Sequence, residues 1–399
     1  MAKVIYLDNN ATTAIAPEVR EAMAPFLDAY YGNPSSIHAF GGQVAKHIDR
    51  AREQVAALLG AEPSEILFTS CGTESDNAAI RSALACYPDR RHLVTTRVEH
   101  PAVLSLCQWL AQPAPGRPHY RLTELPVDAQ GRLNLRELEK AIDDDTAIVS
   151  IMWANNETGV LFPIREIGAL CRRRGVLFHT DAVQAVGKVP IDLAKMPVDM
   201  LSLSGHKLHA PKGIGALYVR RGTRFSPYLI GGHQENNRRG GTESVPLIVA
   251  LGKAAELAAR HLEEEQTRVR ALRDRLEQGI LQSAPGAIRN GHPTERLPNT
   301  SNVSFEYVEG ESILLMLDQH GICASSGSAC TSGSLEPSHV LRAMGVPFTA
   351  AHGSIRFSLS RYNTREEIDK VLKVLPPIIR RLREISPFGR DKPVAAPRG

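Results

Sequence analysis

The feature that most constrains the fold is a regular alternation of short apolar runs with helical patterns between residues 17 and 219. The apolar runs have the length of buried strands, and the segments between them carry the 3.6-residue period of helices. This alternation is typical of a mainly parallel sheet covered by helices on both faces, so we expect an α/β fold. The expected strands are 65–70, 92–96, 146–154, 176–180, 200–203 and 215–219, and the expected helices are 41–59, 73–86, 102–110 and 164–174.

The pattern changes after residue 245, where a long helical stretch is expected to reach residue 283. A chain of 399 residues is longer than one compact core usually holds, so we expect a second, smaller α+β domain. Its expected elements are strands at 300–305 and 354–359 and helices near 310–319 and 364–385. The large domain is predicted at 13–250, the small domain at 1–12 and 251–385, and a loose tail at 386–399.

Composition and charge argue against several classes of protein. Lys and Arg total 47 against 43 Asp and Glu, and a net charge of +4 does not make nucleic acid or an anionic membrane the expected partner. The longest apolar stretch, 147–154, is far shorter than the roughly 20 residues of a membrane span, and no signal-peptide core precedes Asp8. Six cysteines without paired spacing do not form a disulfide framework. We expect a cytoplasmic protein with reduced thiols.

The segment SLSGHKLHAPKGIG, residues 202–215, places Lys207 in a glycine-rich turn directly after an apolar strand. Ligands of α/β sheets bind beyond the carboxyl ends of strands, so Lys207 would project into a cleft. A lysine there can form a Schiff base when burial or nearby cations free its neutral amine. A lysine after a strand is, however, more often a surface charge.

Asp181 ends an earlier apolar run, VLFHTD, about 25 residues before Lys207. A carboxylate there is costly unless it meets a cation. A protonated pyridine nitrogen would serve, and a helix N-cap is the alternative. Gly72 and Thr73 lie between a strand and a helix, where free backbone N–H groups form an anion site suited to phosphate. We interpret Cys71 beside them as a small buried residue rather than a nucleophile.

Two further strand ends carry polar side chains. His100 follows the strand at 92–96, where an imidazole can stack on a planar cofactor or serve as a hydrogen-bonded loop residue. Asn155 and Asn156 follow the strongest apolar strand, where an amide can bind a phenolic oxygen or the backbone of a turn. A phosphate seat, a carboxylate for a ring nitrogen, a stacking imidazole and a Schiff-base lysine together describe a pyridoxal phosphate site.

The ordered motifs TSCGTES, VEHPAV, ANNETG, HTDAVQ, SGHKLHAPKG and SSGSACTSG resemble those of cysteine desulfurases, which are fold-type I pyridoxal phosphate enzymes of the class V aminotransferase family. The resemblance runs from Tyr6–Thr13 to His352–Thr364, and the motif sequences are closest to those of the NifS type. It implies a homodimeric L-cysteine desulfurase that releases L-alanine. It also implies that the sulfur passes to an iron–sulfur scaffold protein, for nitrogenase maturation.

The resemblance further implies a role for each matching position. Lys207 carries the cofactor, Asp181 pairs with its pyridinium, and His100 stacks on its ring and shares proton transfer with Lys207. Arg356 grips the substrate carboxylate, a bidentate task suited to a guanidinium. Asn156 and Gln184 are implied to bind the phenolic oxygen, and Asn156 also to contact the substrate. The implied phosphate contacts are Gly72, Thr73, Ser204, His206 and Thr242. Thr242 would reach the phosphate from the neighbouring subunit.

Cys330 lies in SSGSACTSGS, a run of small residues without apolar cover. A thiol on such a loop can travel to a substrate, and at an ordinary pKa of about 8.5 roughly a tenth of it is ionised near pH 7.5. We expect Cys330 to take the sulfur as a persulfide, and a transient iron–sulfur contact at Cys330 is a further hypothesis. A structural turn is the alternative.

Three other functions stay open on the sequence alone. A selenocysteine lyase or an aminotransferase would share the fold and the cofactor. A non-catalytic scaffold could instead bind a metal through Cys71, Cys330 and the histidines, although no pair has ligand spacing such as C-x2-C.

Overall fold

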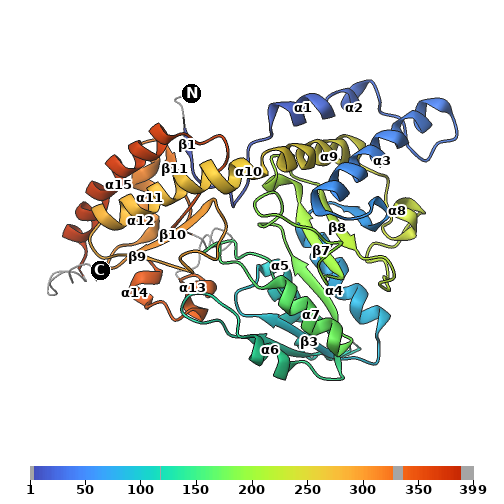
Figure 1. The fold of residues 1–399 in the computed structure, drawn as a ribbon, viewed down its shortest axis with the longest axis horizontal. Helices are drawn as coiled ribbons and strands as arrows, with labels where there is room; N and C mark the ends of the chain where they lie inside the picture. The colour runs from blue at the N-terminus through green and yellow to red at the C-terminus, as the bar shows by residue number, and fades with distance from the viewer. Residues whose placement is uncertain (1–3, 117, 327–335, 388–399) are drawn as a thin grey trace.

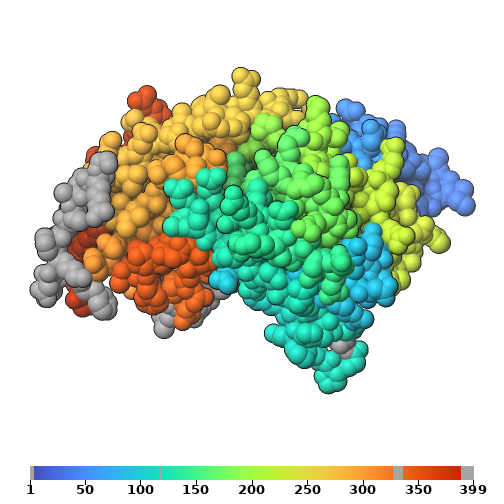
Figure 2. All heavy atoms as spheres, turned by 60° about the horizontal axis from the view of Figure 1, so that its bottom comes forward, coloured from blue at the N-terminus to red at the C-terminus, as the bar shows by residue number. Residues whose placement is uncertain are grey.

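The computed structural model describes residues 4–116, 118–326 and 336–387. Figure 1 shows a large part built around a central sheet and, beside it, a smaller part made mostly of the C-terminal third of the chain. The space-filling view in Figure 2 shows the orange-red surface of that third against the green and teal surface of the sheet-containing part.

The central sheet has seven strands in the order β2-β8-β7-β6-β5-β3-β4. Its pairs are parallel except that β8 runs antiparallel to both β2 and β7. The strands are β2 (Ile66–Thr69), β3 (His92–Thr96), β4 (Arg121–Leu125), β5 (Thr146–Ser150), β6 (Leu177–Asp181), β7 (Met200–Ser204) and β8 (Gly215–Val219). The six strands expected from the apolar runs are all present, and the prediction of a mainly parallel sheet is confirmed.

Helices cover both faces of this sheet, as side-chain alternation along β2 illustrates. Ile66 and Phe68 pack into the largest hydrophobic cluster, whereas Leu67 between them packs into a second cluster on the opposite face. The covering helices are α3 (Ala39–Leu59), α4 (Gly72–Cys86), α5 (Pro101–Ala111), α6 (Leu135–Ala141), α7 (Ile164–Arg174) and α9 (Val245–Arg260). Shorter helices in this part are α1 (Pro17–Met23), α2 (Pro25–Asp28) and α8 (Gln234–Asn237).

The single long helix expected over 245–283 is wrong, because the chain breaks after α9. His261 has φ −99° and ψ 8°, and a short α10 (Leu262–Glu264) and a π-helical turn at Glu265–Val269 precede α11 (Arg270–Ser283). A π turn inserts an extra residue into the helix, often for a local purpose. Here it buries the carboxyl group of Glu265, whose Oε1 lies 3.8 Å from the Lys188 ammonium.

The smaller part contains a three-stranded antiparallel sheet with β10 (Thr300–Phe305) between β9 (Ala287–Arg289) and β12 (Ser354–Ser358). The N-terminal strand β1 (Ile5–Tyr6) pairs in parallel with β11 (Ile322–Cys323). The helices of this part are α11, α12 (Gly310–Asp318), α13 (His339–Ala343), α14 (Phe348–Ala351) and α15 (Arg365–Ile385).

The hydrophobic core of the smaller part joins the two ends of the chain. Ile5 and Leu7 belong to the same cluster as side chains from Val269 to Leu382. Val340 and Leu341 of α13, by contrast, pack into the cluster of the large part. The exact domain limits stay a prediction, and of the predicted tail only residues 386 and 387 are described. Among the described residues, no helix combines the length and the apolar character needed to cross a lipid bilayer.

Candidate active site

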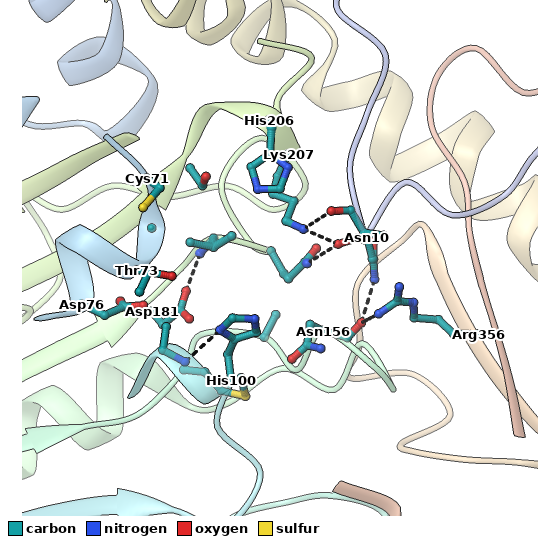
Figure 3. A pocket seen from close by; sticks show the side chains of 18 residues that line it. Asn10, Cys71, Thr73, Asp76, His100, Asn156, Asp181, His206, Lys207 and Arg356 are labelled. Carbon is teal, nitrogen blue, oxygen red and sulfur yellow. Dashed lines mark hydrogen bonds between the residues drawn. The ribbon is translucent and has the colours of Figure 1, made fainter. Parts of the chain in front are cut away.

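A cavity of about 360 Å³ lies at the carboxyl ends of β6 and β7, and segments far apart in the chain line it (Figure 3). Most of the side chains singled out from the sequence meet there. Its lining includes Gly72, Thr73, His100, Asn156, Asp181, Gln184, Ser204, His206, Lys207 and Arg356. The strand-end pattern predicted this convergence for most of these residues, whereas Arg356 was singled out only by the family resemblance.

Lys207 reaches the cavity from the 3₁₀ turn Gly205–Lys207, which follows β7 directly. Its Nζ donates hydrogen bonds to the main-chain carbonyls of Asn10 and Ala11, each at 2.6 Å (Figure 3). The N-terminal segment therefore holds the amine over the cavity. Two carbonyl acceptors suit an ammonium group, which carries three N–H donors, and they fix its position.

Two buried carboxyl groups, Asp181 and Asp76, line the inner end of the cavity. Burial raises the pKa of both groups. The nearby Asp181 raises the pKa of Asp76 further, whereas His100 and Lys207 oppose the rise at Asp181. Asp181 Oδ1 accepts the Val183 N–H at 2.9 Å, whereas Asp76 Oδ1 has no hydrogen-bond partner among the described residues. A cationic or N–H group placed in the cavity would satisfy this negative end.

The imidazole of His100 is held in its neutral form. Burial lowers its pKa, Asp181 opposes this effect, and the neighbouring Lys207 and His339 lower the pKa further. His100 is also the N-cap of α5, where its Nδ1 accepts the Ala102 N–H at 3.1 Å. Since Nδ1 accepts, the proton of the neutral ring is assigned to Nε2, which remains available for a ligand in the cavity.

The start of α4, one helical turn before Asp76, forms a binding site for an anion. Gly72 and Thr73 begin α4, so their N–H groups lie at the positive end of a helix. A Cβ at Gly72 would lie 2.8 Å from Val183 Cγ2, so only glycine leaves this cradle open. His206, next to Lys207, is neutral because burial and Lys207 lower its pKa to about 4.

Cys71 lies beside this anion site and is only partly buried, contrary to its interpretation as a buried packing residue. It is the N-cap of α4, and its Sγ accepts the Glu74 N–H at 3.4 Å. The position at a helix N-terminus explains why a small polarisable side chain stands here.

Arg356 forms the outer end of the cavity and is almost fully buried. Its Nη2 donates to Asp8 Oδ1 at 2.8 Å, and its Nη1 donates to the Asn156 carbonyl at 3.1 Å. These two contacts fix the plane of the guanidinium, as a carboxylate-binding arginine requires. Of the two neighbouring asparagines, Asn156 lines the cavity, whereas Asn155 accepts the N–H groups of Glu157 and Thr158 and serves the turn.

Two predicted site residues do not appear in the lining. Thr242 is exposed and lies outside the described lining of the cavity. Cys330 lies outside the described residues, so its predicted role stays a prediction. The described residues on either side are nevertheless close to the site: Ser325 exchanges main-chain hydrogen bonds with Arg356, and the Ser338 hydroxyl donates to Glu157.

Sequence reasoning missed Asn10 and Asp76, which both line the cavity. Asn10 follows the short apolar strand β1, so the signal that found the other residues, a polar group at a strand end, was also present here. Asp76 gave no such signal, because it lies within α4, where an acidic residue normally faces solvent.

The residues of the cavity fit pyridoxal phosphate. Gly72 and the helix N-terminus suit a phosphate, and Lys207 supplies an amine. The carboxyl group of Asp181, with Asp76 Oδ1 that accepts no hydrogen bond, suits a protonated ring nitrogen. In the described part of the chain, no group of three or more His, Cys, Asp or Glu side chains is placed to hold a metal ion.

Comparison with known proteins points to the same cofactor. "Cysteine desulfurase 2" of Trichormus variabilis is 63% identical over 389 residues, covering 98% of this chain and 96% of that protein. "Cysteine desulfurase NifS" of Azotobacter vinelandii is 60% identical over 385 residues, covering 96% and 94%. A solved structure described as a NifS-like protein superposes with a TM-score of 0.88 at 40% identity, covering 95% of this chain and 100% of that one.

The family resemblance inferred from the motifs is therefore confirmed, and so are the fold and the cofactor that it implied. The model of the aminotransferase class-V family matches residues 5–371, nearly the whole chain. This chain belongs to the class-V aminotransferase family of pyridoxal phosphate-dependent enzymes.

Proposed function

We propose that this enzyme is an L-cysteine desulfurase that releases L-alanine and retains the sulfur as a persulfide on Cys330. The observation that carries the proposal is the cavity that gathers Lys207, Asp181 and Arg356. Relatives that are 60% to 63% identical over almost the whole chain are named cysteine desulfurases, which favours this reaction over others of the same fold.

The cofactor, when bound, supplies an aldehyde for Schiff-base chemistry and a ring that stores an electron pair. Lys207 would supply the amine that holds the cofactor and would take up the Cα proton of the substrate. Arg356 binds the substrate carboxylate, and Asp181 keeps the ring nitrogen protonated. Neutral His100 stacks on the ring and can donate a proton from Nε2. Asn156 and Gln184 bind the phenolic oxygen, and the phosphate is held by the start of α4 with Gly72, Thr73, Ser204 and His206.

The thiolate of Cys330 attacks the sulfur of the bound cysteine. A new S–S bond forms while the C–S bond breaks, and the electron pair of that bond stays with the substrate carbon, which takes up a proton and leaves as alanine. The flanking contacts support this step, because Ser325 pairs with Arg356 and Ser338 with Glu157 at the edge of the cavity.

We also propose a homodimer. Thr242 is exposed on one subunit, as expected of a residue that completes a neighbour's phosphate site. Large apolar side chains are exposed in the same part of the molecule, with Ile230 89% and Ile37 105% exposed. Such side chains are typical of a surface that another protein covers.

The persulfide sulfur is passed to an iron–sulfur scaffold protein, and a transient contact of Cys330 with a cluster belongs to the same step. The relative named NifS supports a role in nitrogen fixation. A cytoplasmic location agrees with the five described cysteines, which are all free thiols.

Replacement of the proposed sulfur acceptor tests this function. Cys330→Ala is expected to lower alanine and sulfide release from L-cysteine by about three orders of magnitude or more, while the visible absorbance of the bound cofactor persists. Cys323→Ala, which removes a thiol seven positions away in β11, is the matched control and is expected to keep activity. Normal turnover by Cys330→Ala would contradict the mechanism, and a keto acid product would favour an aminotransferase instead.

A further inference from the structure

Asn10 occupies a junction between the lysine and the arginine of the site. It is only 2% exposed, and its backbone N–H donates to Ser358 Oγ at 2.9 Å, two residues beyond Arg356 in β12. Its carbonyl accepts from both Lys207 Nζ at 2.6 Å and Gln184 Nε2 at 2.9 Å. The main chain of Asn10 is thus hydrogen-bonded both to Ser358 of β12 and to the amine of Lys207.

The side chain of Asn10 makes a second set of contacts on the arginine side. Its Nδ2 donates to the Asn156 carbonyl at 3.1 Å and to Thr300 Oγ1 at 2.9 Å. Its Oδ1 accepts from Asn299 Nδ2 at 3.1 Å. The Asn156 carbonyl also accepts from Arg356 Nη1 at 3.1 Å, so Asn10 and Arg356 share one acceptor (Figure 3).

These contacts form a continuous route from the guanidinium of Arg356 through the Asn156 carbonyl and Asn10 to the amine of Lys207. A substrate carboxylate at the guanidinium would compete with the shared carbonyl, to which the Asn10 side chain is the other donor. We propose, on the basis of the roles given above to Lys207 and Arg356, that Asn10 is a positioning residue that couples carboxylate binding at Arg356 to the placement of Lys207.

The neighbouring asparagine provides a matched control. Asn9 is 5% exposed, and its Nδ2 donates to the carbonyls of Ser358 at 2.9 Å and Tyr6 at 3.3 Å. It therefore ties the same segment to the same strand but does not line the cavity. Loss of Asn9 loosens the segment, whereas loss of Asn10 also breaks the link between Arg356 and Lys207.

The experiment measures binding of L-alanine to the cofactor-loaded enzyme through the change in visible absorbance, without turnover. Asn10→Ala is expected to weaken the Kd for L-alanine by about tenfold, because it removes the side-chain hydrogen bonds to the Asn156 carbonyl, Thr300 and Asn299 and leaves buried partners unsatisfied. It is also expected to release the cofactor faster on dialysis. Asn9→Ala is expected to keep both quantities within about twofold of the wild-type enzyme, even if its melting temperature falls by as much as that of Asn10→Ala.

A second variant covers the case in which Asn10→Ala does not fold. Asn10→Ser keeps one hydroxyl and is expected to lie between wild type and Asn10→Ala in L-alanine affinity. If the wild-type enzyme responds to L-alanine and Asn10→Ser or Asn10→Ala behaves like Asn9→Ala, the role of Asn10 is wrong while the proposed function stands. If the wild-type cofactor spectrum responds to neither L-alanine nor L-cysteine, the proposed function fails, and the role of Asn10 with it.

Discussion

Burial sets the protonation of the side chains in and around the cavity. It lowers the pKa of His100 and His206, so both imidazoles are neutral, and it raises the pKa of Asp76 and Asp181. Neutral imidazoles can stack or donate one proton without placing a cation beside Lys207, and the acidic end is ready for a cationic ligand. The charges of the site are therefore matched to a phosphate at the start of α4 and to a protonated ring nitrogen beside Asp181.

Glu99, at the end of the strand that leads to His100, illustrates how burial affects stability. It is fully buried, and burial raises its pKa from 4.5 to about 8. The folded protein therefore holds a proton that the unfolded chain loses, so this group makes the protein less stable as the pH rises from 4.5 to about 8. Glu99→Gln keeps the acceptor for Thr96 and Met152 and removes this dependence.

We expect Glu99→Gln to match wild type near pH 5 and to become more stable than wild type by up to about 1.4 kcal/mol per pH unit toward pH 8. Urea unfolding at several pH values measures the difference. A difference that stays constant with pH would show that Glu99 is ionised in the folded protein.

At the scale of elements, the buried strands were predictable, including β2 at one edge of the sheet, whereas the partly exposed edge strand β4 was not. β3 and β8 have the limits that the sequence predicts, and both are buried along their whole length. β4, at the edge of the sheet, reads RLTEL and is partly exposed, so no apolar run marked it. The break between α9 and α11 was hidden as well, since a helical period continues on both sides of the π turn.

The packing of α9 on α3 gives a prediction for these elements. A Cβ at Gly252 of α9 would lie 2.5 Å from Ala51 Cα, a backbone atom of α3 that cannot move alone. Gly252→Ala is therefore expected to destabilise the protein by about 1–3 kcal/mol through overpacking. Gly42→Ala, in α3 with nothing within 4 Å of its Cβ, is the control and is expected to add up to about 1 kcal/mol. Urea unfolding compares the two, and equal stabilities would contradict the close contact.

At the scale of the whole molecule, the site exists only because distant segments meet. Ten residues chosen from separate motifs line one cavity. The sequence could predict this for the residues that follow parallel strands, because the carboxyl ends of such strands share one edge, whereas Arg356 in the antiparallel strand β12 came only from the family resemblance. It could not predict how the N-terminal segment crosses that edge, since the contacts of Asn10 depend on two sheets being placed together. Nor did any local pattern distinguish Asp76 from a surface acid.

This convergence predicts that the cofactor stabilises the whole molecule, and more so at higher pH. In the cofactor-free enzyme, burial raises the pKa of Asp76 and Asp181, so the folded state loses stability as the pH rises above the ordinary carboxyl range. A protonated ring nitrogen beside Asp181 favours the carboxylate, and bound cofactor also stabilises the folded state by mass action. We therefore expect removal of pyridoxal phosphate to lower the melting temperature at every pH, with a gap that widens from pH 5 to pH 8. Thermal unfolding of the loaded and cofactor-free enzyme at several pH values measures this difference in melting temperature. In Asp181→Asn the difference is expected not to grow with pH. A gap that narrows with pH would mean that Asp181 does not meet a cationic ring.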